Sequence, residues 1–459
     1  MQIARRLGQR HYWRLHDFAC AIYSFMPDNE VKKVLHYSAF FILYSIFLSM
    51  AKKEFPFSGF TSLAIHAGHD QDPNYAHLTP IYASSTFVYD TAEQGMRRFS
   101  KQEEGYIYTR WGNPTFTEAE KKIAAMECFG VADANGKPLV AKALLHASGM
   151  AAISTLFISN LKAGDQILSH YSLYGGSQEM MDKILPGLGI EAVIVDLRDL
   201  NKAKEALKAN SHIKMVYLET PANPTLQCVD IEELTKLARK YGKLVACDNT
   251  FATPYLQQPF RYGVDFIIHS TTKFLNGHGT AVGGVLIGRD LEFMTSRAEK
   301  TVQLLGGNSN PFDAFLLING MRTLEVRMER HCHNATEIAN YLEGHAAVAK
   351  VNYTGLPSHP DYYLTSRQMR HPGAIMSIEL KGGLQAGIQM MDRLQLCTRT
   401  VSLGTCDTLL CHPASMTHYG VPKEQREKYG ITDGLIRMSI GMENVQDILI
   451  DLEQSLKGL

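Results

Sequence analysis

FIIHSTTKFLNGHGT, residues 266–280, joins an apolar run to hydroxyl residues, a lysine and a glycine-rich segment. A short apolar run bounded by turn residues is typical of a buried strand. Lys273 follows the end of that strand, with Ser270 and Thr272 beside it. In an open parallel sheet, ligands bind beyond the carboxyl ends of the strands. The stretch therefore predicts a strand whose end carries Lys273 into a binding site.

Similar apolar runs alternate with amphipathic segments on both sides of this stretch. The runs are KALLHAS, QILSHY, EAVIVDL, KMVYLET, KLVACDN and AVGGVLIG. Such alternation predicts an α/β fold with a mostly parallel sheet and crossover helices. Between KMVYLET and KLVACDN, Asp230 and Glu233 predict a helix start and Gly242 its end.

The pattern changes after about residue 320, where longer helices and more turn residues appear. This change predicts a large domain at residues 113–322 and a smaller α+β domain at residues 323–459. A chain of 459 residues is long enough for both.

Composition favours a small-molecule enzyme over a nucleic-acid-binding protein. The 46 basic residues balance the 46 acidic ones, so no global field attracts nucleic acid. The eight cysteines are scattered without a C-x-x-C pair, which predicts reduced thiols and a cytoplasmic location. RHCH, residues 330–333, has no second pair of metal ligands and is interpreted as helix surface, so we expect no metal.

The first fifty residues differ from the rest. VLHYSAFFILYSIFLSMA, residues 34–51, has no charge and is flanked by lysine pairs. Its length is near the lower limit for a membrane span, and its polar residues weaken that interpretation. Three interpretations stay open: a membrane anchor, an apolar extension, or residues translated ahead of a start at Met50. We expect residues 1–50 to be an extension outside the catalytic part, and no membrane attachment.

Two phosphate-binding motifs are excluded by their spacing. GVADANGKP, residues 130–138, has the wrong glycine spacing for an NTPase loop, and a proline stands where Ser or Thr would bind magnesium. GHGTAVGG, residues 277–284, has one residue too many for a dinucleotide fingerprint and leads into a strand.

Pyridoxal phosphate fits the residues at the predicted strand ends. It requires an amine for its aldehyde, an anion for its ring nitrogen and a flat side chain against its ring. Lys273 would form the covalent link, and Asp248, after KLVAC, would keep the ring nitrogen protonated. Asn223, after KMVYLET, would bind the ring oxygen, and Tyr174 would stack on the ring.

The cofactor phosphate also has candidate ligands. Ser148, Gly149 and Met150 stand between a predicted strand and a helix, whose first N–H groups are free to bind an anion. The hydroxyls of Ser270 and Thr272 would join them. Each residue alone has an ordinary structural explanation, but together they predict one cofactor site at one edge of the sheet.

From about Thr61 to the carboxyl end, the sequence resembles the Cys/Met-metabolism enzymes of the aminotransferase-like (fold type I) pyridoxal-phosphate fold. The motifs that carry the resemblance are YTRWGNPT, SGMAAI, ETPANP, DNTFATP, HSTTKFLNGHG, VSLG and GLIRMSIGME.

The resemblance implies further roles. Tyr108 and Arg110 would bind the cofactor phosphate of a neighbouring subunit, so residues 51–112 would form an arm that reaches that subunit. Arg437 would bind the substrate carboxylate, with Ser402 beside it. The family also implies a homotetramer built of catalytic dimers, and a sulfur amino acid as substrate.

Within the family, HPASMTH and GMRTLEVRMERHC resemble the methionine γ-lyases. Such an enzyme converts methionine to methanethiol, 2-oxobutanoate and ammonia. Lys273 would move the protons, and Tyr174 would protonate the departing sulfur. Val401 suits a methyl thioether better than a charged tail. Gly176 departs from the pattern, because those lyases usually have cysteine there.

Two alternatives stay open. The first is another member of the family: an O-acetyl- or O-succinylhomoserine sulfhydrylase, or a cystathionine γ-synthase or γ-lyase. The second is a membrane-tethered binding protein without catalysis, which only residues 34–51 support.

Overall fold

The computed structural model describes residues 56–70 and 72–459. Residues 34–51 lie outside these ranges, so the interpretations of that stretch stay predictions. Within the described ranges, no helix has the length and hydropathy to cross a membrane. The unit Ser58–Leu459 is compact and contains all the described helices and strands.

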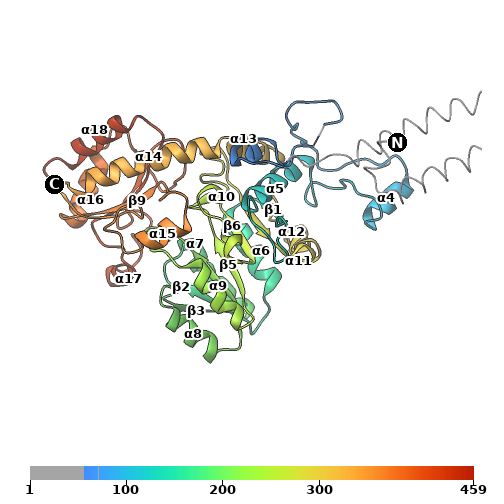
Figure 1. The fold of residues 1–459 in the computed structure, drawn as a ribbon, viewed down its shortest axis with the longest axis horizontal. Coiled ribbons are helices and arrows are strands. Elements are labelled where there is room, and N and C mark those ends of the chain that lie inside the picture. Colours follow the sequence, from blue (N-terminus) through green and yellow to red (C-terminus); the bar gives the residue numbers. More distant parts are fainter. Residues whose placement is uncertain (1–55, 71) are drawn as a thin grey trace, which may run out of the picture. The chain divides into compact units, whose positions relative to one another are not determined.

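A seven-stranded sheet forms the centre of the larger part of this unit (Figure 1). Its order is β1-β7-β6-β5-β4-β2-β3, and every predicted apolar run supplies one strand. The strands are β1 Lys142–His146, β2 Gln166–His170, β3 Glu191–Val195, β4 Ile213–Glu219, β5 Leu244–Asp248, β6 Phe266–His269 and β7 Gly284–Gly288. The prediction of a mostly parallel sheet is confirmed.

Strand β7 differs from the expected parallel arrangement, because it runs antiparallel to both β1 and β6. No helix separates β6 from β7 along the chain. A parallel neighbour requires a crossover connection, usually a helix, whereas a loop returns the chain in the opposite direction. The glycine-rich residues 277–284 belong to that loop.

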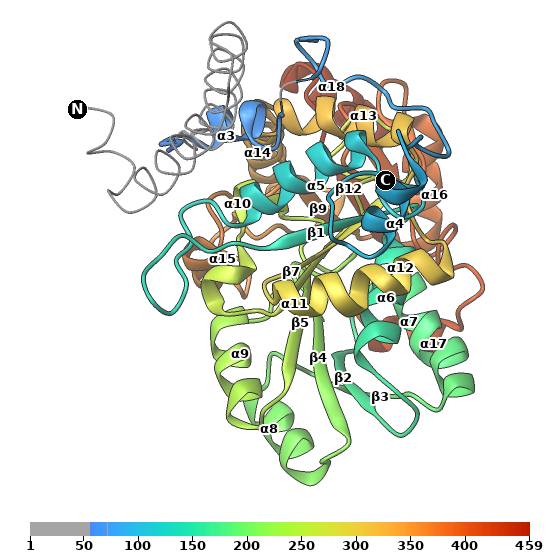
Figure 2. The same cartoon turned by 90° about the vertical axis from the view of Figure 1, so that its right-hand side faces the viewer.

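Helices cover both faces of the large sheet (Figure 2). On one face, α6 packs with α12 and with the irregular helices η1 and η4 around a buried apolar cluster. Helices α8 and α9 pack against each other, and both also contact strands of the large sheet: α8 contacts β2 and β3, and α9 contacts β5. Helix α9 begins and ends as predicted: the Asp230 side chain accepts from the Glu233 N–H at 3.0 Å, and Gly242 has a positive φ.

The helices of this larger part are the following: α3 Phe60–His66, α4 Ala92–Phe99, α5 Pro114–Glu127, α6 Gly149–Asn160, α7 Gly175–Glu179, η1 Met180–Ile184, η2 Leu185–Leu188, α8 Leu200–Ala209, α9 Ile231–Lys240, α10 Thr253–Leu256, η3 Pro259–Tyr262, α11 Leu291–Phe293, η4 Met294–Ala298, α12 Glu299–Leu305 and α13 Pro311–Arg322.

A second sheet of five strands, in the order β10-β11-β12-β9-β8, follows along the chain. Its strands are β8 Val348–Asn352, β9 Ile375–Leu380, β10 Thr398–Arg399, β11 Leu409–Cys411 and β12 Leu435–Ser439. Helices α14 Leu324–Glu343, α16 Gly383–Arg393 and α18 Val445–Leu456 bury their apolar sides against it. Two shorter helices, α15 Tyr362–Gln368 and α17 Lys423–Lys428, complete the α+β arrangement. The predicted boundary at residues 322 and 323 stays a prediction, because one compact unit spans it.

The RHCH cluster lies in α14, and its interpretation as helix surface is wrong for two of its residues. His331 and Cys332 are buried, and the Nδ1 atom of His331 lies 2.7 Å from the backbone oxygen of Ile440. Both residues lie on the same face of α14 as its buried apolar residues, and this face packs against the second sheet. Among residues 56–70 and 72–459, no group of His, Cys, Asp or Glu is arranged to hold a metal.

Candidate active site

Strands β4, β5 and β6 end side by side and bring three predicted segments together. Glu219 and Asp248 are register partners at the ends of β4 and β5, and Asp248 is paired with Ile268 of β6. Beyond β6 the chain turns tightly, since the Lys273 N–H donates to the Ser270 carbonyl at 3.2 Å. The predicted convergence at this sheet edge is therefore present in the fold.

The Lys273 side chain points towards the segment that joins β10 and β11 of the second sheet. Its Nζ atom donates to the Oγ of Ser402 at 3.1 Å, and Ser402 lies between β10 and β11. Burial, together with the smaller effect of the nearby Arg437 guanidinium, lowers the pKa of the Lys273 amine to about 8. A desolvated amine with this pKa is partly neutral near pH 7, so it is able to act as a nucleophile and a base.

Arg437, on β12, is buried beside the same serine. Its Nη2 atom donates to the carbonyl oxygens of Val401 and Ser402 at 3.1 and 2.7 Å, and Nη1 donates to the Oδ1 of Asn223 at 3.4 Å. The Nε–H is buried and has no partner among the described residues. An unpaired N–H on a buried guanidinium leaves a donor for a ligand carboxylate.

Asp248 is held so that it stays buried with one oxygen free. Its Oδ1 accepts the N–H and the hydroxyl of Thr250 at 3.0 and 2.5 Å. Its Oδ2 has no donor among the described residues. Burial raises the pKa of Asp248, while the Thr250 hydrogen bonds and the charge of His269 lower it. A protonated ring nitrogen would supply the missing donor to Oδ2.

Ser148 is the N-cap of α6, because its side chain accepts from the Ala151 N–H at 3.1 Å. The N–H groups of Gly149 and Met150 make no hydrogen bond in the part of the chain that the structure describes. A Cβ atom on Gly149 would lie 3.0 Å from the Cβ of Ser270. Glycine thus lets the start of α6 approach the turn after β6, which places free N–H groups beside Ser270.

Thr272 has a structural role in the same turn. Its Oγ1 accepts the Gly283 N–H at 3.0 Å and donates to the Gly283 carbonyl at 3.2 Å. The Ser270 N–H donates to the Thr250 hydroxyl at 2.9 Å. These bonds fix the loop between β6 and β7, so that both hydroxyl residues stay near the α6 N-terminus.

Tyr174 is the N-cap residue of α7, and its backbone N–H donates to the Oε2 of Glu219 at 2.7 Å. Its side chain is 51% exposed, so the ring is free to contact a ligand. A Cβ atom on Gly176 would lie 2.7 Å from Cε1 of this ring and 3.0 Å from the sulfur of Met150. The Tyr174 ring therefore occupies space that a cysteine side chain at position 176 would need.

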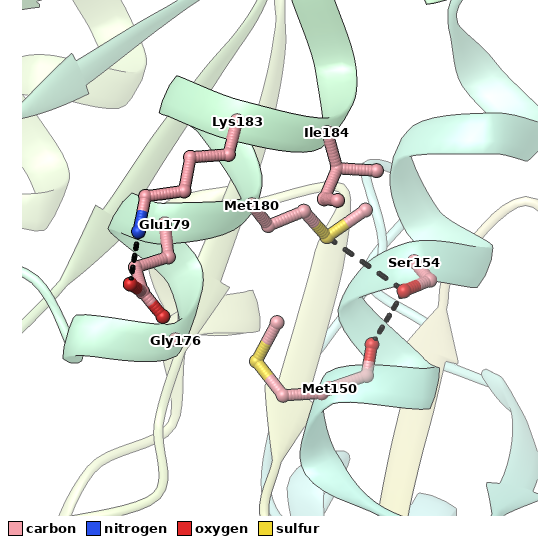
Figure 3. Close-up of a pocket in the computed structure, with 7 residues that line it drawn as sticks. All are labelled: Met150, Ser154, Gly176, Glu179, Met180, Lys183 and Ile184. Carbon is pink, nitrogen blue, oxygen red and sulfur yellow. Dashed lines mark hydrogen bonds and ion pairs between the residues drawn. The ribbon is translucent and has the colours of Figure 1, made fainter. Parts of the chain in front are cut away.

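Met150 and Gly176 also line a cavity of about 340 Å³ (Figure 3). Its far wall includes Met180 and the Lys183–Glu179 ion pair of 2.6 Å. Lys273 does not line it. The cavity therefore adjoins the predicted site at Met150 and does not include Lys273.

Tyr108 and Arg110 lie apart from these residues. The Arg110 guanidinium donates to the backbone oxygen of Gln303 in α12 and lies 5.5 Å from the centre of the Tyr108 ring. Among the described residues, neither side chain hydrogen-bonds to Ser270, Thr272 or Lys273. Every other predicted site residue lies on β12, in the segment between β10 and β11, or around the carboxyl ends of β1, β2, β4, β5 and β6.

Two residues of this site were missed in the sequence. Glu219 closes β4 and binds Tyr174, and Thr250 binds Asp248. The signal for Glu219 was present, because it stands at a strand end within ETPANP. Thr250 follows Asp248 by two residues, which is the usual spacing for a local side-chain hydrogen bond.

These residues fit the parts of pyridoxal phosphate one by one. The arrangement offers a desolvated amine, a carboxylate with a free oxygen, a helix start with two free N–H groups and an exposed aromatic ring. The seven-stranded sheet with its α+β companion is the aminotransferase-like arrangement of fold type I. Fold and site together define a pyridoxal-phosphate-dependent enzyme of that class.

Comparison with known proteins agrees. Residues 61–457 match the family described as Cys/Met metabolism PLP-dependent enzyme. The chain is 46% identical to an L-methionine gamma-lyase of Fusobacterium nucleatum subsp. nucleatum, over 88% of this chain and 99% of the relative. It is 44% identical to an L-methionine gamma-lyase of Porphyromonas gingivalis, over 89% of this chain and 100% of the relative.

A solved structure shares the fold at similar coverage. The cystathionine gamma synthase from Xanthomonas oryzae pv. oryzae superimposes with a TM-score of 0.79 and 37% identity, over 87% of this chain and 97% of that one. The chain belongs to the Cys/Met-metabolism family of pyridoxal-phosphate-dependent enzymes.

Proposed function

We propose that this chain catalyses the γ-elimination of L-methionine, which takes up one water and yields methanethiol, 2-oxobutanoate and ammonia. The observation that carries the proposal is the position of Ser402 between Lys273 and Arg437, at 3.1 and 2.7 Å. A proton carrier and a carboxylate-binding group are therefore within reach of one small amino acid. The 46% identity to a lyase named for methionine supports the substrate.

Arg437 binds the substrate in this proposal. Its guanidinium carries a buried Nε–H without a partner, and its Nη atoms already hold Asn223 and Ser402 in place. A planar guanidinium grips a carboxylate through two hydrogen bonds, which fixes the direction of the Cα–H bond. The substrate is thereby oriented before any bond breaks.

Lys273 moves the protons. When bound, pyridoxal phosphate supplies an aldehyde for the substrate amine and a ring that accepts electrons from Cα. Lys273 would take the proton from Cα, release it and, as a neutral amine again, take one from Cβ; its pKa of about 8 suits a base that works near neutral pH. Tyr174 gives a proton to the departing sulfur, and Asp248 holds the proton of the ring nitrogen.

Val401 favours methionine over cystathionine as the substrate. Its side chain is 57% exposed, while its backbone carbonyl accepts from Arg437 at 3.1 Å. An apolar side chain next to the carboxylate-binding group offers contact to a methyl thioether. It offers no anion to the distal ammonium group of cystathionine, which would lose hydration without compensation.

Tyr108 and Arg110 serve a second copy of the chain. Within their own chain they lie beside α12, in which the backbone oxygen of Gln303 accepts from Arg110. Residues 51–112 would then act as the arm that completes the phosphate site of another subunit, within a homotetramer of catalytic dimers.

The test is incubation of the purified, pyridoxal-phosphate-loaded protein with methionine alone. The proposal expects 2-oxobutanoate and methanethiol in equal amounts. The fold that the chain shares with a cystathionine gamma synthase makes γ-replacement the second candidate. If 2-oxobutanoate is absent and cystathionine forms from an activated homoserine with cysteine, the enzyme is a synthase.

The enzyme is proposed to work in the cytoplasm. Cell fractionation separates this from the membrane-tethered alternative, which rests on residues 34–51 outside the described ranges. A yellow protein in the cytosolic fraction is the expected result. A colourless protein in the membrane fraction would favour the tethered binding protein.

A further inference from the structure

Two buried carboxyl groups stand next to each other at the sheet edge. Glu219 and Asp248 are register partners in the parallel pair β4–β5, and both residues are buried. Register partners of neighbouring parallel strands point to the same face of a sheet, and the strands are about 4.8 Å apart. The two acids therefore share one small region without bulk water.

No cation compensates the pair from the Glu219 side. Among the described residues, no Lys, Arg or His forms an ion pair with Glu219. The titratable groups that interact with it are acids: Asp248 and Cys247 on β5, and Tyr217 on β4. Two neighbouring carboxylates in a buried site cannot both ionise at ordinary cost, so one of them retains a proton.

The surroundings of the two acids differ. Asp248 accepts a hydroxyl and an N–H from Thr250, and His269 lowers the pKa of its carboxyl. In the part of the chain that the structure describes, Glu219 has no hydroxyl donor and no cation as a partner. Its Oε2 accepts the Tyr174 N–H at 2.7 Å, and the Asn223 backbone N–H also faces it. Charge is therefore better stabilised on Asp248.

We propose that Glu219 is a positioning residue that stays protonated in the working enzyme. Its neutral carboxyl group fixes the backbone of Tyr174 through Oε2 and leaves the negative charge of the pair on Asp248. This inference rests on the proposed function for the roles of Tyr174 and Asp248. It makes Glu219 a residue that controls the position of Tyr174. Glu219 also determines that Asp248 is the ionised acid of the pair.

Burial and the neighbouring Asp248 raise the pKa of Glu219 to about 8, in agreement with the geometry. Burial, and after it the charge of Asp248, raises the pKa of Tyr217, whose hydroxyl is buried. The proton on Glu219 belongs on Oε1, because Oε2 already accepts the Tyr174 N–H. A glutamine at this position would keep an oxygen acceptor and would never ionise.

The test is infrared difference spectroscopy of the holoenzyme, wild type minus Glu219→Gln, as pH is raised from acid to alkaline. The proposal expects a carboxylic-acid C=O band at neutral pH that is absent from Glu219→Gln and that disappears as pH passes about 8. In Asp248→Asn, which removes the neighbouring carboxylate, the band should still come from Glu219 but should disappear at a lower pH than in wild type. If wild type lacks the band at neutral pH, or Asp248→Asn and not Glu219→Gln removes it, the proposal is overturned.

Kinetics supply a second readout. Glu219→Gln should lower kcat/KM by less than about tenfold, whereas Glu219→Leu, which removes the acceptor of the Tyr174 N–H, should lower it at least about tenfold more. If Glu219→Gln keeps most of the activity, a neutral hydrogen-bond acceptor is sufficient at this position and a negative charge is not required. If glutamine and leucine are equally damaging, Glu219 works as an anion and the proposal is wrong.

The two proposals fail separately. The infrared band is measured without substrate, so it reports on Glu219 whichever sulfur amino acid the enzyme converts. Absence of 2-oxobutanoate from methionine would change the proposed reaction and leave the band in place.

Discussion

The Nζ atom of Lys273 lies 3.1 Å from the Oγ of Ser402, although 129 residues separate them in the chain. The contact joins the turn after β6 to the loop before β11, so the large sheet and the second sheet both contribute to one site. Arg437 binds the carbonyl of the same serine at 2.7 Å. Ser402 thereby fixes the separation between the proton carrier and the proposed carboxylate-binding group.

Arg437 should be needed for substrate binding and not for cofactor binding. Arg437→Lys keeps the charge but loses the planar pair of donors, so kcat/KM for methionine should fall about 100-fold or more. Steady-state kinetics together with the absorbance of bound cofactor check this. Arg367→Lys, at an exposed ion pair with Asp230, is the matched control. A small effect at position 437 would show that the carboxylate binds elsewhere.

The pH dependence of cofactor incorporation should report the Lys273 amine. Burial lowers its pKa to about 8, with Arg437 as the second cause. Only the neutral amine reacts with an aldehyde, so the rate should rise with pH and level off above about 8. Arg437→Leu removes a positive charge, so it should raise the pKa and move this profile to higher pH. Stopped-flow absorbance of apoenzyme mixed with pyridoxal phosphate measures it, and an unmoved profile contradicts the electrostatic coupling.

Gly149→Ala should weaken cofactor binding. Its Cβ would lie 3.0 Å from the Cβ and 3.3 Å from the Cα of Ser270, so α6 would have to shift away from the turn. Overpacking of this kind costs about 1–3 kcal/mol, which corresponds to a rise of about 5- to 160-fold in the Kd for pyridoxal phosphate. Fluorescence titration of apoenzyme gives the Kd. Gly187→Ala, where a Cβ meets nothing within 4 Å, is the control.

The buried pair Glu127–His269 should stabilise the folded protein where α5 ends beside the end of β6. The carboxylate lies 2.5 Å from the His269 Nε2 and also accepts from Asn249 at 3.1 Å, and both paired side chains are fully buried. Glu127→Ala leaves polar groups without a partner, so the free energy of unfolding should fall by about 3–5 kcal/mol. Denaturant unfolding of the apoprotein measures the loss, and Glu127→Gln, which keeps an acceptor, should lose less.

Glu219 should make stability depend on pH in an unusual direction. Its pKa in the folded chain is raised to about 8 from an ordinary value of 4.5, so between these values the folded state holds a proton that the unfolded state has lost. Stability contributed by this group is therefore present below pH 4.5 and is lost as pH rises towards 8. Relative to wild type, Glu219→Gln should gain stability across this window. Thermal unfolding of the two apoproteins at several pH values checks the sign.

The strands were predictable because each is a compact apolar run between turn residues. KMVYLET and KLVACDN became β4 and β5, and the functional residues that follow them lie where the rule for parallel sheets puts them. The antiparallel direction of β7 was missed. An apolar run does not indicate in which direction its strand runs. The sequence signal for an antiparallel β7 was the lack of a crossover helix after His269.

Contacts between distant segments could not be obtained from spacing alone. Ser402 and Arg437 were assigned through a family resemblance, and their hydrogen bonds with Lys273 and Asn223 depend on how the second sheet packs. Glu219 was overlooked for a different reason. A glutamate at the end of a strand is an ordinary residue until the register places Asp248 next to it.

The account depends on Lys273 as the amine that binds pyridoxal phosphate covalently. Borohydride reduction of the yellow holoenzyme, followed by digestion and mass spectrometry of the labelled peptide, tests this most directly. The expected result is one labelled peptide from residues 266–280 that carries the pyridoxyl group on Lys273. A label on another lysine, or no label at all, would contradict the assignment and the proposed reaction with it.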